Sequence, residues 1–192
     1  MKSDITHMID ESLNASLNAK KEFWKQSRSD FFAAAELVKA TLKSGNKILI
    51  CGNGGSACDA LHFAGELVNR FQKDRPGLSC IALTADAPLL TCIANDYAFE
   101  KIFSRQVQAH GRKGDLLIGI STSGNSKNVI EALKEAHGLG VKRLALLGGS
   151  GGKIAQSKEY DQALCVSSTQ STPRIQEVHC WILHSLCEYL DA

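Results

Sequence analysis

The sequence predicts an α/β fold in which a three-layer, doubly wound parallel sheet follows an N-terminal helical extension. Two observations lead to this fold class. Residues 3–42 contain neither Gly nor Pro, and their apolar residues recur at helical spacing. Beyond residue 44, short apolar runs alternate with turns and with amphipathic stretches of helix length. Continuous apolar strands joined by helices indicate a parallel sheet that is covered on both faces.

The N-terminal segment is expected to form one or two long helices. Val38 and Leu42 illustrate its helical spacing, and the turn-forming residues 44–46 end it. We therefore divide the chain into N-terminal helices over residues 1–43 and one sheet domain over residues 44–192. In a monomer these helices would leave an apolar stripe poorly covered, so we expect them to serve oligomerisation.

The remaining elements follow from the apolar runs. Each expected strand is continuously apolar and is followed by a turn and a helix-length stretch. The final segment, from residue 174 to about residue 190, has one apolar side and reads as a single helix. The expected strands are residues 47–51, 80–83, 116–120, 143–147 and 163–166.

Composition limits the classes of partner. The chain has 192 residues, 22 basic against 20 acidic, and no run of Lys or Arg. This balance argues against a nucleic-acid surface, and no apolar stretch approaches the roughly 18 residues that span a membrane. Seven scattered cysteines, an odd number set mostly in apolar stretches, indicate free thiols in a reducing compartment. With no signal-peptide core near its start, the protein is expected in the cytoplasm.

The first strand leads into a glycine-rich turn, residues 52–56, where Asn53 and Ser56 could bind hydroxyls or phosphate. Gly52, Gly54 and Ala57 also match the dinucleotide fingerprint GxGxxA. That match is unspecific, because any tight strand-to-helix turn needs small residues. No acidic residue stands at the end of the next strand, so we do not favour a dinucleotide.

The third strand leads into a second turn, residues 121–126, with four hydroxyl side chains around one glycine. An ordinary N-cap explains one hydroxyl, whereas four at the carboxyl end of a strand suit a tetrahedral phosphate. A third glycine-rich turn, residues 148–152, carries one hydroxyl and is interpreted as a flexible connection. The second turn is therefore the predicted phosphate site.

Two predicted helices carry possible metal ligands. His62 and Glu66 stand four residues apart, so they share one helix face. Gln176, Cys180 and His184 likewise line one side of the last helix. His, Glu, Gln and His would suit zinc if the two helices meet. Periodicity leaves other residues of the last helix open as competing ligands: Glu177, His179 and Cys180.

Four segments taken together resemble the phosphoheptose isomerases, a branch of the sugar isomerase (SIS) domain family. The resemblance runs from about residue 44 to the C-terminus. The ordered set is specific, although each segment alone is short. The segments read CGNGGSACDALHFAGEL, IANDYAFEKIFSRQV, GDLLIGISTSGNSKNVIEAL and RIQEVHCWILH.

The resemblance implies a flavodoxin-like SIS fold, a homotetramer and one Zn2+ per subunit. It also implies conversion of sedoheptulose 7-phosphate to D-glycero-D-manno-heptose 7-phosphate, a step toward the heptose of lipopolysaccharide cores. Carried over by position, the zinc ligands are His62, Glu66, Gln176 and His184. The implied substrate contacts are Asn53, Gly54, Gly55, Glu66, Asn95, Asp96, Ser121, Thr122, Ser123, Ser126 and Gln176.

The chemistry of an aldose–ketose isomerase suggests roles for two of these residues. Moving a carbonyl from C2 to C1 needs a base for a carbon-bound proton and an acid for the oxygens. We predict Glu66 as the base and His184 as the acid. Asn95 and Asp96 are candidates for contribution by a neighbouring subunit. The chain departs from some family members at residues 171–173, where Thr172 replaces an acidic residue.

Two other functions remain open at this point. Some SIS-domain relatives are non-catalytic tetramers that bind the bacterial replication initiator. Others sense sugar phosphates or isomerise a different phosphorylated ketose. A binding module needs no acid–base or metal set, so the joint presence of His62, Glu66, Gln176 and His184 favours an enzyme.

Overall fold

The computed structural model describes residues 2–192 and has one five-stranded parallel sheet at its centre. The strands are ordered β2-β1-β3-β4-β5, so β1 and β3 are neighbours and the chain winds outward from them in both directions. This confirms the predicted fold class, and every predicted strand is present within about one residue of its expected ends. The strands are β1 (Ile48–Cys51), β2 (Cys80–Ala82), β3 (Leu116–Ser121), β4 (Lys142–Gly148) and β5 (Gln162–Val166).

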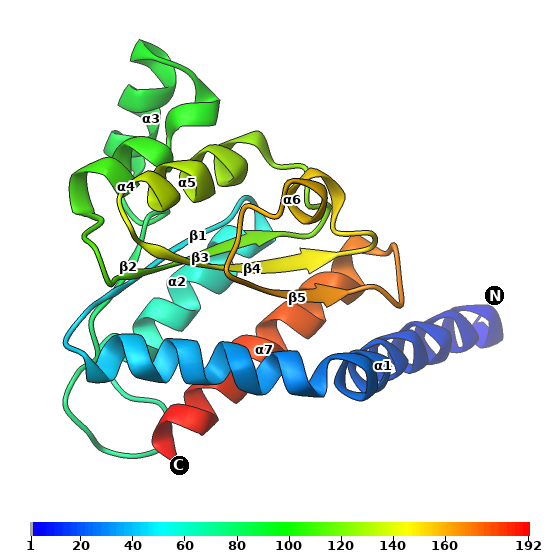
Figure 1. Ribbon diagram of the computed structural model, residues 1–192. Helices are drawn as coiled ribbons and strands as arrows, with labels where there is room; N and C mark the ends of the chain where they lie inside the picture. Colours follow the sequence, from blue (N-terminus) through cyan, green and yellow to red (C-terminus); the bar gives the residue numbers. More distant parts are fainter. Residues whose placement is uncertain (1) are drawn as a thin grey trace.

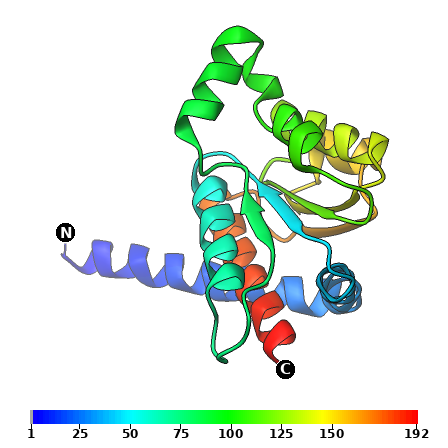
Figure 2. The ribbon, with the colours of Figure 1, turned by 90° about the vertical axis from the view of Figure 1, so that its left-hand side faces the viewer.

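Helices cover both faces of the sheet (Figures 1 and 2). The central strands β1, β3 and β4 are buried on both sides, which explains why their apolar runs are continuous rather than alternating. One face carries α1 (Lys2–Lys43), α2 (Gly55–Val68) and α7 (Thr172–Asp191). The other side carries α3 (Ala87–Asp96), the 3-10 turn η1 (Phe99–Lys101), α4 (Ser104–His110), α5 (Lys127–Gly138) and α6 (Gly152–Ser157).

Helix α1 has two parts that meet at Ser27, whose φ of −120° and ψ of 19° are not helical. After this kink, Phe31 and Val38 are buried in the core that α1 shares with the sheet, α2 and α7. Before it, the helix projects past the sheet (Figure 1) and leaves Ile5, Met8 and Leu13 more than half exposed. The oligomerisation role predicted for residues 1–43 stays a prediction.

Strand register brings the two candidate loops together. Ile50 of β1 lies opposite Ile118 of β3, and both strands end at the same edge of the sheet. The turns that follow β1 and β3 are therefore neighbours at the carboxyl edge, where open parallel sheets bind ligands. In the part of the chain that the structure describes, no helix is both long enough and apolar enough to cross a membrane.

Candidate active site

The turn after β1 is shaped by the close approach of α7. Gly54 has a φ of 56°, which a residue with a β-carbon rarely adopts. A β-carbon at Gly55 would lie 2.7 Å from the side chain of Gln176. The absence of side chains here lets Gln176 lie directly over the start of α2.

Asn53 in the same turn is held by a residue that sequence reasoning missed. Its side-chain amide forms two reciprocal hydrogen bonds, of 2.9 and 2.8 Å, with the amide of Asn128 on the first turn of α5. Asn128 is buried, and its oxygen also accepts a bond from its neighbour's backbone N–H. The pair links the turn after β1 to the helix after β3. A polar residue just beyond the STSGNS motif was the signal available in the sequence.

The turn after β3 gathers its hydroxyls around a helix N-terminus. Ser126 precedes α5, yet its hydroxyl makes no capping bond and instead lies 2.8 Å from the Ser121 hydroxyl. The backbone N–H of Asn125 donates to the Ser123 hydroxyl at 3.2 Å. An N-cap cluster therefore does not account for these hydroxyls. Their place at the start of a 12-residue helix suits an anion.

The third glycine-rich turn supports this loop, and our interpretation of it as a flexible connection is wrong. The carbonyl of Gly124 accepts a bond from Ile154 N–H, and the side chain of Asn125 accepts one from Lys153 N–H, both at 3.0 Å. A β-carbon on Gly152 would overlap the carbonyl oxygen of Ser123. The backbones of the two turns are in contact, so the turn before α6 packs directly against the predicted phosphate loop.

Helices α2 and α7 are in contact. The sequence alone did not establish this contact, on which the predicted zinc site depends. The Nε2 atoms of His62 and His184 lie 2.7 Å apart, with their rings edge to face at 4.9 Å between centroids. Glu66 Oε1 lies 3.5 Å from His62 Nε2. Three of the four predicted ligands thus form one cluster, and Gln176 lies about two helical turns before His184 on α7, next to the glycine turn.

Asp59 belongs to this cluster and was missed from the sequence, although it lies on the same face of α2, three residues before His62. Its Oδ1 accepts a bond from Gln176 Nε2 at 3.4 Å. Its Oδ2 is buried and has no partner among the described side chains. Burial raises the pKa of Asp59, and its bond to Gln176 and the nearby His62 and His184 partly offset that rise.

The chemistry of these side chains fits a zinc ion, since two imidazole nitrogens, a carboxylate and an amide oxygen are ligands that zinc accepts. The buried, unpartnered Asp59 oxygen near the two histidines is a further acceptor that suits a cation. Among the described residues, however, no three His, Cys, Asp or Glu side chains are already arranged to hold a metal. His62, Glu66, Gln176 and His184 are the residues that could hold one.

Of the competing residues on α7, His179 and Glu177 have partners outside the cluster, whereas Cys180 lies close to Asp59. His179 is fully buried and lies 2.9 Å from the Leu147 carbonyl through its Nε2, and burial lowers its pKa to about 4. Glu177 is paired with Arg174 at 2.9 Å. Burial raises the pKa of Cys180, which disfavours the thiolate that a metal needs. The rotation of α7 about its axis thus removes His179 and Glu177 from the candidate ligands, and the raised pKa disfavours Cys180.

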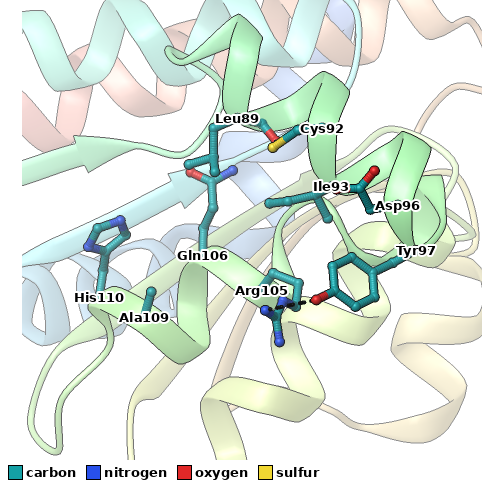
Figure 3. A pocket seen from close by; sticks show the side chains of 9 residues that line it. All are labelled: Leu89, Cys92, Ile93, Asp96, Tyr97, Arg105, Gln106, Ala109 and His110. Carbon is teal, nitrogen blue, oxygen red and sulfur yellow. Dashed lines mark hydrogen bonds between the residues drawn. The ribbon is translucent and has the colours of Figure 1, made fainter.

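Asn95 and Asp96 do not join the other predicted residues within one chain. They end α3, on the far side of the sheet from α7 (Figures 1 and 2), where Asn95 donates to Asp96 at 2.9 Å. Asp96 lines a cavity of about 270 Å³ between α3 and α4 (Figure 3), with Arg105 over the Tyr97 ring at 4.7 Å. Thr172 is the exposed first residue of α7.

Comparison with known proteins gives one consistent result. The SIS domain family model matches residues 13–148. A Helicobacter pylori phosphoheptose isomerase is 51% identical over 181 residues, which cover 94% of this chain and 89% of the relative. The solved phosphoheptose isomerases of Neisseria gonorrhoeae and Francisella tularensis are 45% and 39% identical and superpose with TM-scores of 0.91 and 0.92. Each alignment covers 97% of this chain, and 98% and 97% of the two relatives respectively.

Proposed function

Because the chain belongs to the SIS domain family, in its phosphoheptose isomerase branch, we propose that it converts sedoheptulose 7-phosphate to D-glycero-D-manno-heptose 7-phosphate, for heptose of the lipopolysaccharide core. One observation carries this proposal. A His–Glu–His cluster lies between α2 and α7, and Gln176 and Asp59 connect it to the glycine turn, which is one of two turns at the carboxyl edge of the sheet that are suited to a phosphorylated sugar. Such an arrangement can anchor a phosphate while acid–base chemistry occurs at the other end of the substrate.

The phosphate is anchored by the turn after β3. Ser121, Thr122, Ser123 and Ser126 supply hydroxyls there, and the N-terminus of α5 supplies backbone N–H groups. Binding energy at this end orients the distant C1 and C2 atoms. Asn53, Gly54 and Gly55 bind hydroxyls of the sugar chain from the neighbouring turn.

His62, Glu66, Gln176 and His184 would hold one zinc ion per subunit. The bond from Gln176 Nε2 to Asp59 leaves the Gln176 amide oxygen available as a ligand. A bound zinc would stabilise the negative charge that develops on the substrate oxygens.

Glu66 and His184 move the protons. The Glu66 carboxylate removes a proton from C1 of the ketose, which yields the enediol, and returns it to C2 of the aldose. His184 moves a proton between the oxygens on C1 and C2, so that the carbonyl changes place. Glu66 is partly exposed and lies farther from His62 than His184 does, which favours a carboxylate free to act as a base.

The working enzyme is a homotetramer in this proposal, and Asn95 and Asp96 serve a neighbouring subunit. Two observations support it. These residues lie away from the histidine cluster of their own chain, and the N-terminal half of α1 exposes an apolar stripe that a second copy can cover.

All seven cysteines are free, which is in keeping with the reducing cytoplasm.

The replication-initiator alternative is not favoured. The relatives from Helicobacter pylori, Neisseria gonorrhoeae and Francisella tularensis, at 39–51% identity, are named as phosphoheptose isomerases, and a binding module has no use for converging histidines and a carboxylate.

The deciding experiment is isomerase activity of the purified protein on sedoheptulose 7-phosphate, before and after chelation and with Zn2+ added back. We expect turnover that is lost on chelation and restored by zinc. His137→Gln, which alters an exposed histidine on α5, should behave as wild type. Turnover that survives complete chelation would remove zinc from the mechanism, and no turnover in any metal state would overturn the isomerase itself.

A further inference from the structure

The loop that joins α2 to β2 is fastened to the end of α7 by one buried carboxylate. Asp191 accepts hydrogen bonds from the backbone N–H groups of Gln72 and Lys73, at 3.0 and 3.1 Å, and from Arg75 Nε at 3.0 Å. The Asp191 side chain is 3% exposed and that of Arg75 is 14% exposed. Because this salt bridge is largely buried and the carboxylate accepts three hydrogen bonds, it holds the loop against the end of α7.

Arg75 passes this restraint on to α2. Its two terminal nitrogens donate to the backbone carbonyls of Leu67 and Glu66, at 2.9 and 3.0 Å. These carbonyls are in the last turn of α2, where they lack partners within the helix and where a cation is favoured. The arginine therefore holds the backbone of Glu66 itself.

The same loop carries Phe71 against the active site. Its ring is stacked on the imidazole of His184, with centroids 5.8 Å apart and planes 25° apart. His62 meets the same imidazole edge on. An imidazole with a flat ring on its face cannot turn about its bond to the β-carbon without losing that contact, so Phe71 fixes the plane in which Nε2 points at His62.

We propose that Phe71, held in place by the Arg75–Asp191 pair, is a positioning residue that sets the orientation of His184 and the placement of Glu66. The inference rests on the proposed function for its catalytic consequence. It assigns a task to a loop that lies outside both turns of the proposed substrate site, the phosphate turn (residues 121–126) and the sugar-binding turn (residues 52–56).

Phe71→Leu tests the inference, because leucine keeps apolar contact but has no flat face. We expect zinc binding about tenfold weaker, the lower end of the range for groups that orient metal ligands. The affinity is measured by competition with a chromophoric chelator. Catalytic turnover, kcat, should fall, while KM stays at the wild-type value because the phosphate turn is untouched. Phe71→Tyr, which restores a flat ring, should recover both properties.

Two further variants separate positioning from general stability. Phe32→Leu makes the same change in a partly exposed aromatic cluster on α1 and should leave zinc affinity and kcat unchanged. Asp191→Asn releases the loop without altering any ring, and should reproduce the Phe71→Leu effect on zinc affinity. A folded Phe71→Leu protein with wild-type zinc affinity and kcat would overturn the inference.

A spectroscopic measurement keeps the inference testable if the proposed function fails. In protein labelled with 13C-histidine, the ring C–H signals of His184 are assigned from their loss in His184→Gln. The ring current of Phe71 shifts these signals, so Phe71→Leu should move them and Phe71→Tyr should not. If the His184 signals are unmoved in Phe71→Leu, the stacking is not formed in solution and the inference is wrong, whatever reaction the protein catalyses.

Discussion

The turn that we propose binds phosphate and the histidine cluster are held in place by different kinds of contact. The turn at residues 121–126 packs against backbone atoms of the turn before α6, and glycines occupy the positions where these two segments touch. The cluster consists of side chains that project from α2 and α7, and other side chains restrain them. The turn should therefore be sensitive to an added β-carbon, whereas the histidine cluster should be sensitive to a changed functional group.

Glu66→Gln should have the largest effect. It tests whether the histidine cluster depends on the functional group of its carboxylate. Glutamine has nearly the same shape but cannot accept the proton from C1, so kcat should fall about 100- to 10,000-fold. KM should change little, because the phosphate turn is intact. Steady-state kinetics measure both constants. Glu135→Gln, at a partly exposed position on α5, is the matched control. Wild-type turnover in Glu66→Gln protein that still holds zinc would contradict the assigned base.

Gly124→Ala should break the backbone-held half. Gly124 has a φ of 64°, and a β-carbon there would overlap the Gly151 carbonyl oxygen. We expect about 1–3 kcal/mol of destabilisation, together with a raised KM. Thermal unfolding and steady-state kinetics measure these. Gly138→Ala meets no atom within 4 Å and is the control. A Gly124→Ala protein with unchanged melting temperature and KM would show that the two turns do not constrain each other.

Ser123→Ala sharpens the contrast by removing one hydroxyl without moving the backbone. The loss of one hydrogen bond to a charged phosphate is worth about 1.5–3 kcal/mol, so KM should rise roughly tenfold or more. The value of kcat should not change. Ser157→Ala, on α6, removes a hydroxyl that donates to the Ile154 carbonyl and serves as control. An unchanged KM would remove Ser123 from the phosphate site.

The smallest of these effects should be the change in the pH dependence of stability that Asp191→Asn causes, apart from its effect on zinc affinity. Bonds from Lys73 N–H, Arg75 and Gln72 N–H lower the pKa of Asp191 below 3.8, the ordinary value for an aspartate side chain. The ionised carboxylate therefore adds stability above pH 3.8 that is lost as pH falls through the lower folded pKa. The melting temperature of the variant should lie below that of wild type at neutral pH. The difference should shrink below pH 4, and a constant difference down to pH 2 would contradict this.

Much of this architecture was predictable because its signals are local. Apolar runs such as residues 116–120 identified the buried strands, and the residues after them identified turns with hydroxyls or glycines. His62 and Glu66 share a helix face at any orientation of α2, so their proximity needed no further information. On α7 the same reasoning left Gln176, Glu177, His179, Cys180 and His184 undecided.

The sequence by itself determined the order of strands and helices along the chain, the two candidate turns and the pairing of His62 with Glu66, because each depends on residues close along the chain. Only the tertiary structure decided that His179 enters the core while His184 meets His62 across 122 positions, since the rotation of α7 is set by packing against the sheet. It likewise revealed Asp59, Asn128 and the supporting turn at residues 148–152. Contacts between distant segments leave no periodic signal in a single sequence, which is why these roles appear only in the folded chain.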